Sequence, residues 1–263
     1  MAGFAAVMAA MFWPADRAML LSLTGERSHG LFLSEEEWHG LYFGERRIGH
    51  GMTRLREEGG RLHVEQGLHL RLLIAGQARR IDNRLRLALA PDLGLQELDF
   101  EAEVSGMGIS ARGRLENGRL VATVSLGPEA LRFEYPVPAR LVLEPLLLRR
   151  LAREDLSAGR RYRTEVFDPR SLAQKEIEIE VVALEALPGP SGLRPAVHLR
   201  RQQSGIVLDT WIDGEGRVLR EESSLGLRSL REDRSTAEAE PESLPELDSA
   251  ALQGLLPALP GAP

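Results

Sequence analysis

Apolar and polar residues alternate along most of the chain between Trp38 and Arg231. In residues 61–72 the even positions are almost all apolar, whereas the odd positions are polar or glycine. The same alternation recurs in residues 97–104 and 176–181. Successive side chains of a strand point to opposite faces, so strict alternation predicts strands with one buried face and one solvent-facing face.

Turn signals separate these strands at spacings that suit consecutive antiparallel hairpins. They are Gly44-Glu45, Gly59-Gly60, Ala75-Gly76, Pro91–Gly94, Asn117-Gly118 and Asp213–Gly216. If Asn117-Gly118 is a two-residue loop, Ala111 faces Val124. A loop at Pro91–Gly94 likewise places Leu85 opposite Phe100. A shift of one residue would turn the core outward, so this apolar-on-apolar pairing predicts a meander.

Residues 138–155 break the period of two. Leu143, Leu146, Leu147 and Leu151 recur at helical spacing, and Pro145 suits a first helical turn. We expect a helix of about ten residues here. The strands are expected to resume over residues 161–167, 175–185, 195–202, 206–212 and 217–222.

The predicted fold is mainly β: one strongly curved antiparallel meander sheet, with the helix capping its concave side. A sheet of this length must coil toward a barrel or half-barrel. Residues 35–232 form this single domain. Residues 1–34 are expected to be an N-terminal apolar segment and linker, and residues 233–263 a disordered, acidic, proline-rich tail.

Residues 2–13 form an apolar run that is shorter than the ~20 residues a bilayer requires. No Lys or Arg precedes the run, unlike in a typical secretory signal. Two interpretations stay open: a short helix or frayed end on the body, or an export signal or membrane anchor. Any membrane association is expected only through this segment.

Composition excludes several classes of function. The 263 residues include 33 basic and 39 acidic side chains of mixed sign, which argues against nucleic-acid binding. The absence of cysteine excludes disulfides, thiolate metal sites and a cysteine nucleophile. The glycines in residues 40–51 lie in strands and a turn rather than before a helix, which argues against a phosphate-binding loop. The acidic rows face arginines on the solvent-facing side, which argues against catalytic carboxylates. No catalytic residue and no cofactor is therefore assigned.

Histidines form one unexpected constellation. The derived register aligns His39, His50, His69 and Asp82 across four neighbouring strands on one face. Imidazoles with a carboxylate are typical zinc ligands, but strands ~4.8 Å apart separate the outer members too far to share an ion without bending. The alternative is cross-strand stacking of the histidines, with Asp82 as a hydrogen-bond partner. No residue is assigned as a metal ligand.

In a half-barrel the inward face serves both as core and as ligand cavity. Small inward residues would leave room for a ligand if the helix does not fill it. The predicted cup-lining, ligand-binding residues are Leu68, Leu70, Leu85, Phe100, Ala111, Gly113, Ala122, Phe133 and Leu147.

Four segments carry a resemblance to a known family: WHGLYFGERRIGHG, ISARGRLENGRL, YRTEVFDPRSL and TWIDGEGRVLREESSLGL. Together they resemble an uncharacterised bacterial β-rich domain that often precedes a transglutaminase-like domain in exported or membrane-anchored proteins. That family is similar in topology to LolA-like half-barrels. The resemblance implies a cup for an acyl chain or a partner segment, and a periplasmic or membrane-anchored location; otherwise the location is cytoplasmic. Since the chain is predicted to end in a tail, we do not expect the usual catalytic domain after it.

The leading hypothesis is a non-enzymatic binding module of a bacterial cell-envelope protein. Its cup would hold an apolar ligand, such as a lipid, or a segment of an envelope protein. The second hypothesis is a structural or adaptor domain that works with a separate transglutaminase-like or envelope protein. The third is a metal-dependent hydrolase that uses the histidine row.

Overall fold

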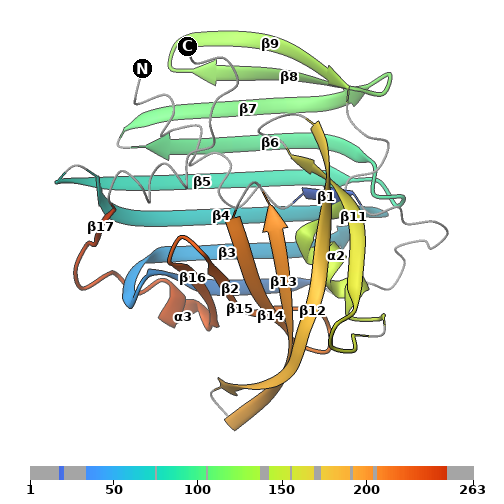
Figure 1. Ribbon diagram of the computed structural model, residues 1–263. Coiled ribbons are helices and arrows are strands. Elements are labelled where there is room, and N and C mark those ends of the chain that lie inside the picture. The colour runs from blue at the N-terminus through green and yellow to red at the C-terminus, as the bar shows by residue number, and fades with distance from the viewer. Residues whose placement is uncertain are drawn as a thin grey trace.

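The computed structural model describes residues 18–20, 34–74, 76–104, 106–136, 142–154, 156–168, 173–189, 192–203 and 206–247. All strands in these ranges belong to one 17-stranded sheet, which is antiparallel except for its last short strand (Figure 1). The prediction of a mainly β protein with one curved sheet is confirmed.

The sheet consists of two meanders. The first contains β2 (Glu35–Phe43), β3 (Arg46–Glu58), β4 (Arg61–Ile74), β5 (Gln77–Leu89), β6 (Leu95–Val104), β7 (Met107–Glu116), β8 (Arg119–Leu126) and β9 (Glu129–Pro136). The second contains β11 (Arg161–Asp168), β12 (Ala173–Gly189), β13 (Gly192–Gln203), β14 (Ile206–Ile212), β15 (Val218–Ser223) and β16 (Leu227–Glu232). The short β1 (Ala18–Leu20) pairs with both β11 and β10 (Val142–Leu143).

A long-range seam joins the two meanders. β16 pairs antiparallel with β2, from Leu227 opposite Phe43 to Glu232 opposite Trp38. The first strand of one meander therefore lies beside the last strand of the other, and the sheet curls so that β11 to β13 run across the first meander in Figure 1. The ladder does not close, because β9 has no partner beyond β8 among the described strands.

The predicted hairpin registers hold, with one informative exception. Ala111 faces Val124 and Leu85 faces Phe100, as expected. Between β2 and β3, however, Tyr42 faces Arg47 whereas Leu41 faces Gly49, so Ile48 is an extra residue. Such a β-bulge turns every later side chain of one strand to the other face.

The helix α2 (Glu144–Leu151) lies between the meanders and is part of the core. Four of its leucines are at most 4% exposed: Leu146, Leu147, Leu148 and Leu151. They belong to one cluster with Leu87 and Phe100 of the first meander and Ile179 and Leu199 of the second. The predicted capping helix is confirmed, although it has eight residues rather than about ten.

The turn between β14 and β15 packs directly on this helix. Gly216 has a φ of +76°, and a Cβ added to it would lie 2.4 Å from the Cα of Arg149 and from the carbonyl oxygen of Leu148. The Asp213 carboxylate holds the turn, since it accepts hydrogen bonds from the backbone N–H groups of Glu215 and Arg217.

The predicted disordered tail starts too early, because the segment directly after β16 forms regular secondary structure. Residues 234–237 form the short helix α3 (Arg234–Ala237), which Asp233 caps by accepting a hydrogen bond from the backbone of Thr236. The strand β17 (Glu246–Leu247) then pairs in parallel with the end of β4, beyond the last residue that β3 pairs. The cap and the full burial of Ala237 give this acidic segment a defined place.

The predictions for residues 2–13 and 248–263 lie outside the described residues. β1 extends the sheet into the region that was expected to be a linker. None of the helices in the described ranges combines the length and the apolar character that crossing a membrane requires.

Replacing Gly216 tests the contact between the turn and α2. Gly216→Ala should lower the free energy of unfolding by about 2 kcal/mol or more, because the new Cβ is strained at positive φ and collides with helix backbone. Gly214→Ala, in the same turn, meets no atom within 4 Å and should change it little. Urea denaturation of both variants measures the difference; equal effects would contradict the close packing.

A polar cluster ties the seam together, and its alkaline titration is testable. The Tyr42 hydroxyl donates to Glu232 at 2.6 Å and accepts from Arg47, which is paired with Glu232 at 2.8 Å. Burial, followed by the hydrogen bond to Glu232, raises the pKa of Tyr42 to about 12.

Because the folded protein keeps this proton above the ordinary tyrosine pKa of about 10, the free energy of unfolding should fall as the pH rises from there to about 12. Tyr42→Phe should remove this dependence, and Tyr135→Phe should retain it. Denaturation curves at several alkaline pH values compare the slopes. An unchanged slope in Tyr42→Phe would refute the assignment.

Candidate functional site

The predicted cup-lining residues lie mostly in the packed interior. Seven of them are buried: Leu68, Leu70, Leu85, Phe100, Ala111, Ala122 and Leu147. Gly113 and Phe133 are half-buried. Leu147 comes from α2 itself, in the same cluster as Phe100 and Ala111, so the helix fills this part of the concave side. That these residues bind a ligand stays a prediction.

The β12–β13 hairpin projects beyond its neighbours. β11 pairs with β12 only as far as Glu180, and β14 pairs with β13 only from Val197. The described residues 182–189 and 192–196 therefore form a two-stranded arm, which points downward in Figure 1. We call this segment the arm.

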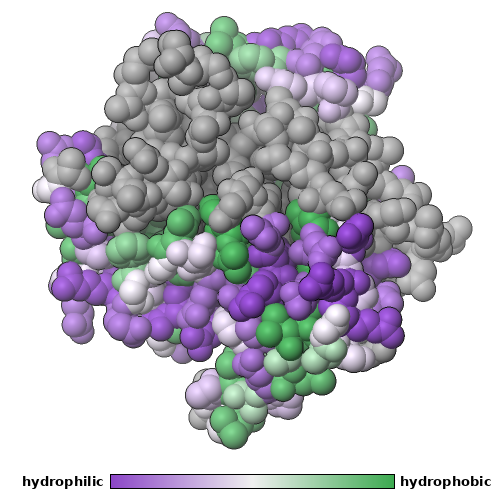
Figure 2. Space-filling model, viewed as in Figure 1, coloured by the Kyte–Doolittle hydropathy of each residue, from purple (hydrophilic) through white to green (hydrophobic). Residues whose placement is uncertain are grey.

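One face of the arm is apolar and open to solvent. By the register, Ala186 lies opposite Pro195 and Pro188 opposite Leu193, and Leu184 is on the same face. Leu184 is 67% exposed and Leu193 is 74% exposed. Figure 2 shows apolar surface on this projection, at the bottom of the view. We call this surface the arm face.

A polar cluster holds the base of the arm. The His198 ring stacks on Trp211 at 4.3 Å, with Nδ1 3.2 Å from Glu185 and Nε2 2.8 Å from Asp209. Trp211 also donates to Glu185, at 3.0 Å. These bonds connect β12, β13 and β14 and fix the direction of the arm.

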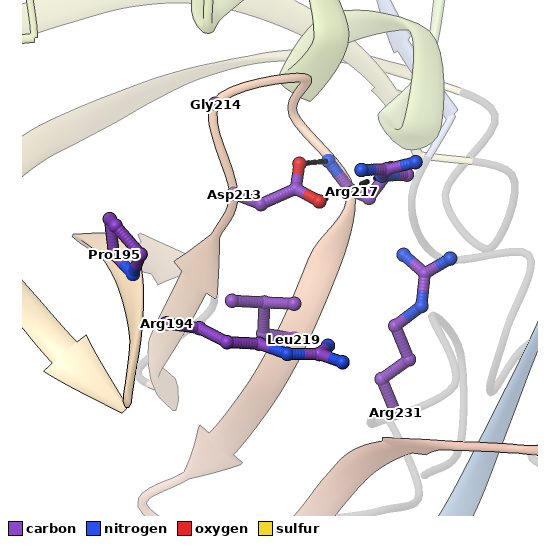
Figure 3. Close-up of a pocket in the computed structure, with 7 residues that line it drawn as sticks. All are labelled: Arg194, Pro195, Asp213, Gly214, Arg217, Leu219 and Arg231. Atoms are coloured by element: carbon purple, nitrogen blue, oxygen red, sulfur yellow. Dashed lines mark hydrogen bonds and ion pairs between the residues drawn. The ribbon is translucent and has the colours of Figure 1, made fainter. Parts of the chain in front are cut away.

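An open pocket of about 610 Å³ lies at the base of the arm (Figure 3). Its lining comes from β13, the β14–β15 turn, β15 and β16: Arg194, Pro195, Asp213, Gly214, Arg217, Leu219 and Arg231. Three of these seven residues are arginines and one is acidic. We call this the arginine pocket.

The acidic residue of the arginine pocket is already engaged. Asp213 accepts from Nε of Arg217 at 2.7 Å, and Glu215 lies 2.8 Å from the same guanidinium. Although burial opposes it, the hydrogen bond and charge of Asp213 raise the pKa of Arg217. Arg194 has no ion pair with a described residue.

Behind the pocket lies a buried ion cluster on the concave side. Arg149 of α2 is 8% exposed, and its Nη2 lies 2.6 Å from Glu37 and 2.5 Å from Glu35. Arg231 is the second cation near Glu37, at 3.9 Å. Burial raises the pKa of Glu37 against the opposing charges of Arg231 and Arg149. The cluster ties α2 to β2.

The structure brings together only part of the predicted histidine row. His50 stacks on His69 at 5.1 Å, and Nδ1 of His69 lies 2.6 Å from Asp82. His39 is on the other face, because the bulge at Ile48 sets it opposite Gly51, and its Nε2 lies 3.1 Å from the Val218 carbonyl. The predicted alignment of His39 with His50 is wrong.

The cross-strand stacking alternative for the histidines is confirmed. Burial, together with the charge of His69, lowers the pKa of His50. Within the described ranges, no group of three or more His, Asp or Glu side chains is arranged to hold a metal ion.

The arginine pocket and the arm face were not found from the sequence. The pocket collects residues from positions 194 to 231, and no local pattern links them. The arm face does carry a signal, because apolar residues alternate at positions 184, 186 and 188, beyond residue 185, where the predicted strand ends.

No protein-family model matches the chain, and no curated protein matches it. Among solved structures, the chain is similar to a β-barrel-like protein of a domain of unknown function, DUF1849, from Brucella abortus. The identity is 12% and the TM-score 0.53, over 75% of this chain and 95% of that one. This likeness shows a shared barrel-like fold.

A DUF1089 family protein from Pseudomonas aeruginosa also matches, over 64% of this chain and 87% of that one. The identity is 22%, and the TM-score of 0.30 is too low to support any argument.

Removing Arg149 tests the buried ion cluster. Arg149→Leu should lower the free energy of unfolding by about 3 kcal/mol near pH 8, because Glu35 and Glu37 lose their shared cation. The loss should shrink as the pH falls toward 5, since a protonated Glu37 needs no counterion. Arg150→Leu, at the next helix position, should have a smaller effect. Denaturation of Arg149→Leu, of Arg150→Leu and of the double variant Glu37→Gln/Arg149→Leu measures the coupling between Arg149 and Glu37. Equal losses of stability in Arg149→Leu and Arg150→Leu would contradict this coupling.

Proposed function

We propose that the protein is a non-enzymatic binding module that docks a partner protein through the arm face. One observation carries the proposal: two leucines are about 70% exposed on a projecting hairpin whose base is held by hydrogen bonds. Large apolar side chains grouped on a projection are typical of an interaction site. Burying each leucine on docking would contribute about 1.5–3 kcal/mol.

The prolines of the arm favour docking on its face rather than along its edges. Pro188 and Pro195 lack a backbone N–H, so neither strand offers a complete hydrogen-bonding edge to an added strand. A partner with an apolar groove fits this surface better than an extended strand does.

The charges of the arm favour a protein over a lipid surface. Its described residues carry one basic side chain, Arg194, and one acidic side chain, Glu185. Binding to an anionic bilayer usually requires a cluster of basic residues beside the apolar ones. The likeness to a barrel-like domain of unknown function is compatible with a binding role. The motif resemblance supports a partner in the bacterial cell envelope.

A second candidate function is a carrier of an apolar ligand, favoured by the open end of the concave side. Leu131 of β9 is 60% exposed, and the adjacent Phe133 is half-buried opposite Ala122. Displacement of an apolar dye by a fatty acid, with a loss of affinity in Phe133→Glu but not in Leu193→Glu, would support the carrier.

The docking proposal is tested with a photo-crosslinking residue at position 193, in cells that produce the full chain. We expect one discrete protein to be captured. The purified partner should bind the wild type about 100-fold more tightly than Leu184→Glu/Leu193→Glu, because two buried leucines are lost. Leu131→Glu changes a leucine on another strand that is 60% exposed, and this variant should bind like the wild type.

Three results would overturn the proposal. They are crosslinking to lipid alone, crosslinking only to a second copy of this chain, and equal binding of the partner by the double variant and the control.

A further inference from the structure

We propose that the arginine pocket binds a small organic oxyanion, a carboxylate or a phosphate attached to a short apolar group. The inference is independent of partner docking, since the arm face and the pocket share only Pro195. It follows from three arginine residues that line one cavity.

The three arginines come from separate elements and meet at one place. Arg194 lies on β13, Arg217 follows the β14–β15 turn, and Arg231 lies on β16. Figure 3 shows the guanidinium of Arg231 extending toward Arg217. The side chain of Arg194 lies against Gly189, on the neighbouring strand of the arm. Like charges repel, so a pocket lined by three arginines favours a bound anion.

The protein's own carboxylates leave one of these cations without an ion pair among the described residues and pair another only at long range. Asp213 and Glu215 both pair with Arg217. Arg194 has no ion pair among the described residues. The nearest carboxylate to Arg231 is that of Glu37, at 3.9 Å, which is beyond hydrogen-bond range.

The guanidinium of Arg231 also has an unmet hydrogen bond. Its Nη1 is buried and has no hydrogen-bond partner. Oε2 of Glu37 lies 3.9 Å from this Nη1, while Oε1 of the same carboxylate is bound to Arg149 at 2.6 Å. Buried donors without an acceptor are rare and unfavourable, and an oxygen of a bound anion would satisfy this one.

The shape of the site defines the rest of the ligand. A guanidinium matches the two oxygens of a carboxylate or phosphate with parallel hydrogen bonds. Leu219 and Pro195 supply an apolar wall beside the arginines. A cavity of about 610 Å³ is of the size that holds small organic molecules.

The test is isothermal titration of the full chain at low ionic strength with phenyl phosphate, 3-phenylpropionate and inorganic phosphate. We expect 1:1 binding of at least one phenyl-substituted anion, more tightly than inorganic phosphate. Arg231→Gln and Arg194→Gln should each weaken it about tenfold, because each loses a charge-assisted hydrogen bond. Tighter binding of the phosphate or of the carboxylate decides between the two sources of the oxyanion.

Arg132→Gln is the matched control, since it removes one exposed arginine from β9, far along the sheet. It should bind the anion like the wild type, and so should Leu193→Glu, which disrupts the arm face alone. Arg194 has no ion pair to lose, so Arg194→Gln should melt like the wild type and keep the test valid if Arg231→Gln unfolds.

Two outcomes would overturn the proposal. One is the absence of binding for every probe up to about 10 mM, because a defined site would have a lower dissociation constant than this. The other is an equal loss of affinity in Arg194→Gln and Arg132→Gln, which would show attraction to net charge rather than a defined pocket.

Discussion

Burial of the four leucines of α2 between two meanders is the constraint on which the rest of the structure depends. Neither meander covers its own apolar face, and the helix supplies the third wall of a shared core. The sheet therefore curls around α2 rather than staying open. The same helix carries Arg149 and receives the β14–β15 turn, so core packing also places the charged cluster beside it.

Because α2 fills part of the interior, this part of the concave side is unfavourable for binding a ligand. Leu85, Phe100 and Ala111, which would line an empty cup, belong to the same cluster as the leucines of α2. A ligand there would have to displace leucines that are almost fully buried. The groups that are accessible for binding lie outside this core: the exposed leucines on the arm and the arginines at its base. Both features lie on the second meander, where strands of unequal length leave the hairpin without neighbours.

The histidine row shows how a correct local register can still mislead. The pairing of His50 with His69 and of His69 with Asp82 followed from loop positions and holds. Because Ile48 is an extra residue in β3, His39 lies on the opposite face and the four residues do not form one row. At this bulge Gly49 has a φ of +152°, and a Cβ at this position would collide with the His69 carbonyl. Only glycine, which lacks a Cβ, avoids the collision. An isolated glycine in a strand is the signal that could have warned of the bulge.

The sequence by itself determined the strands, most hairpin registers and the existence of the helix, because these depend on side-chain periodicity and on turn residues close in the chain. Only the tertiary structure decided that β16 pairs with β2, that α2 fills the concave side, and that Arg194, Arg217 and Arg231 share a pocket. The physical reason is that these contacts join segments far apart in the chain, where no local period constrains them. They arise from curling of the whole sheet around one buried helix.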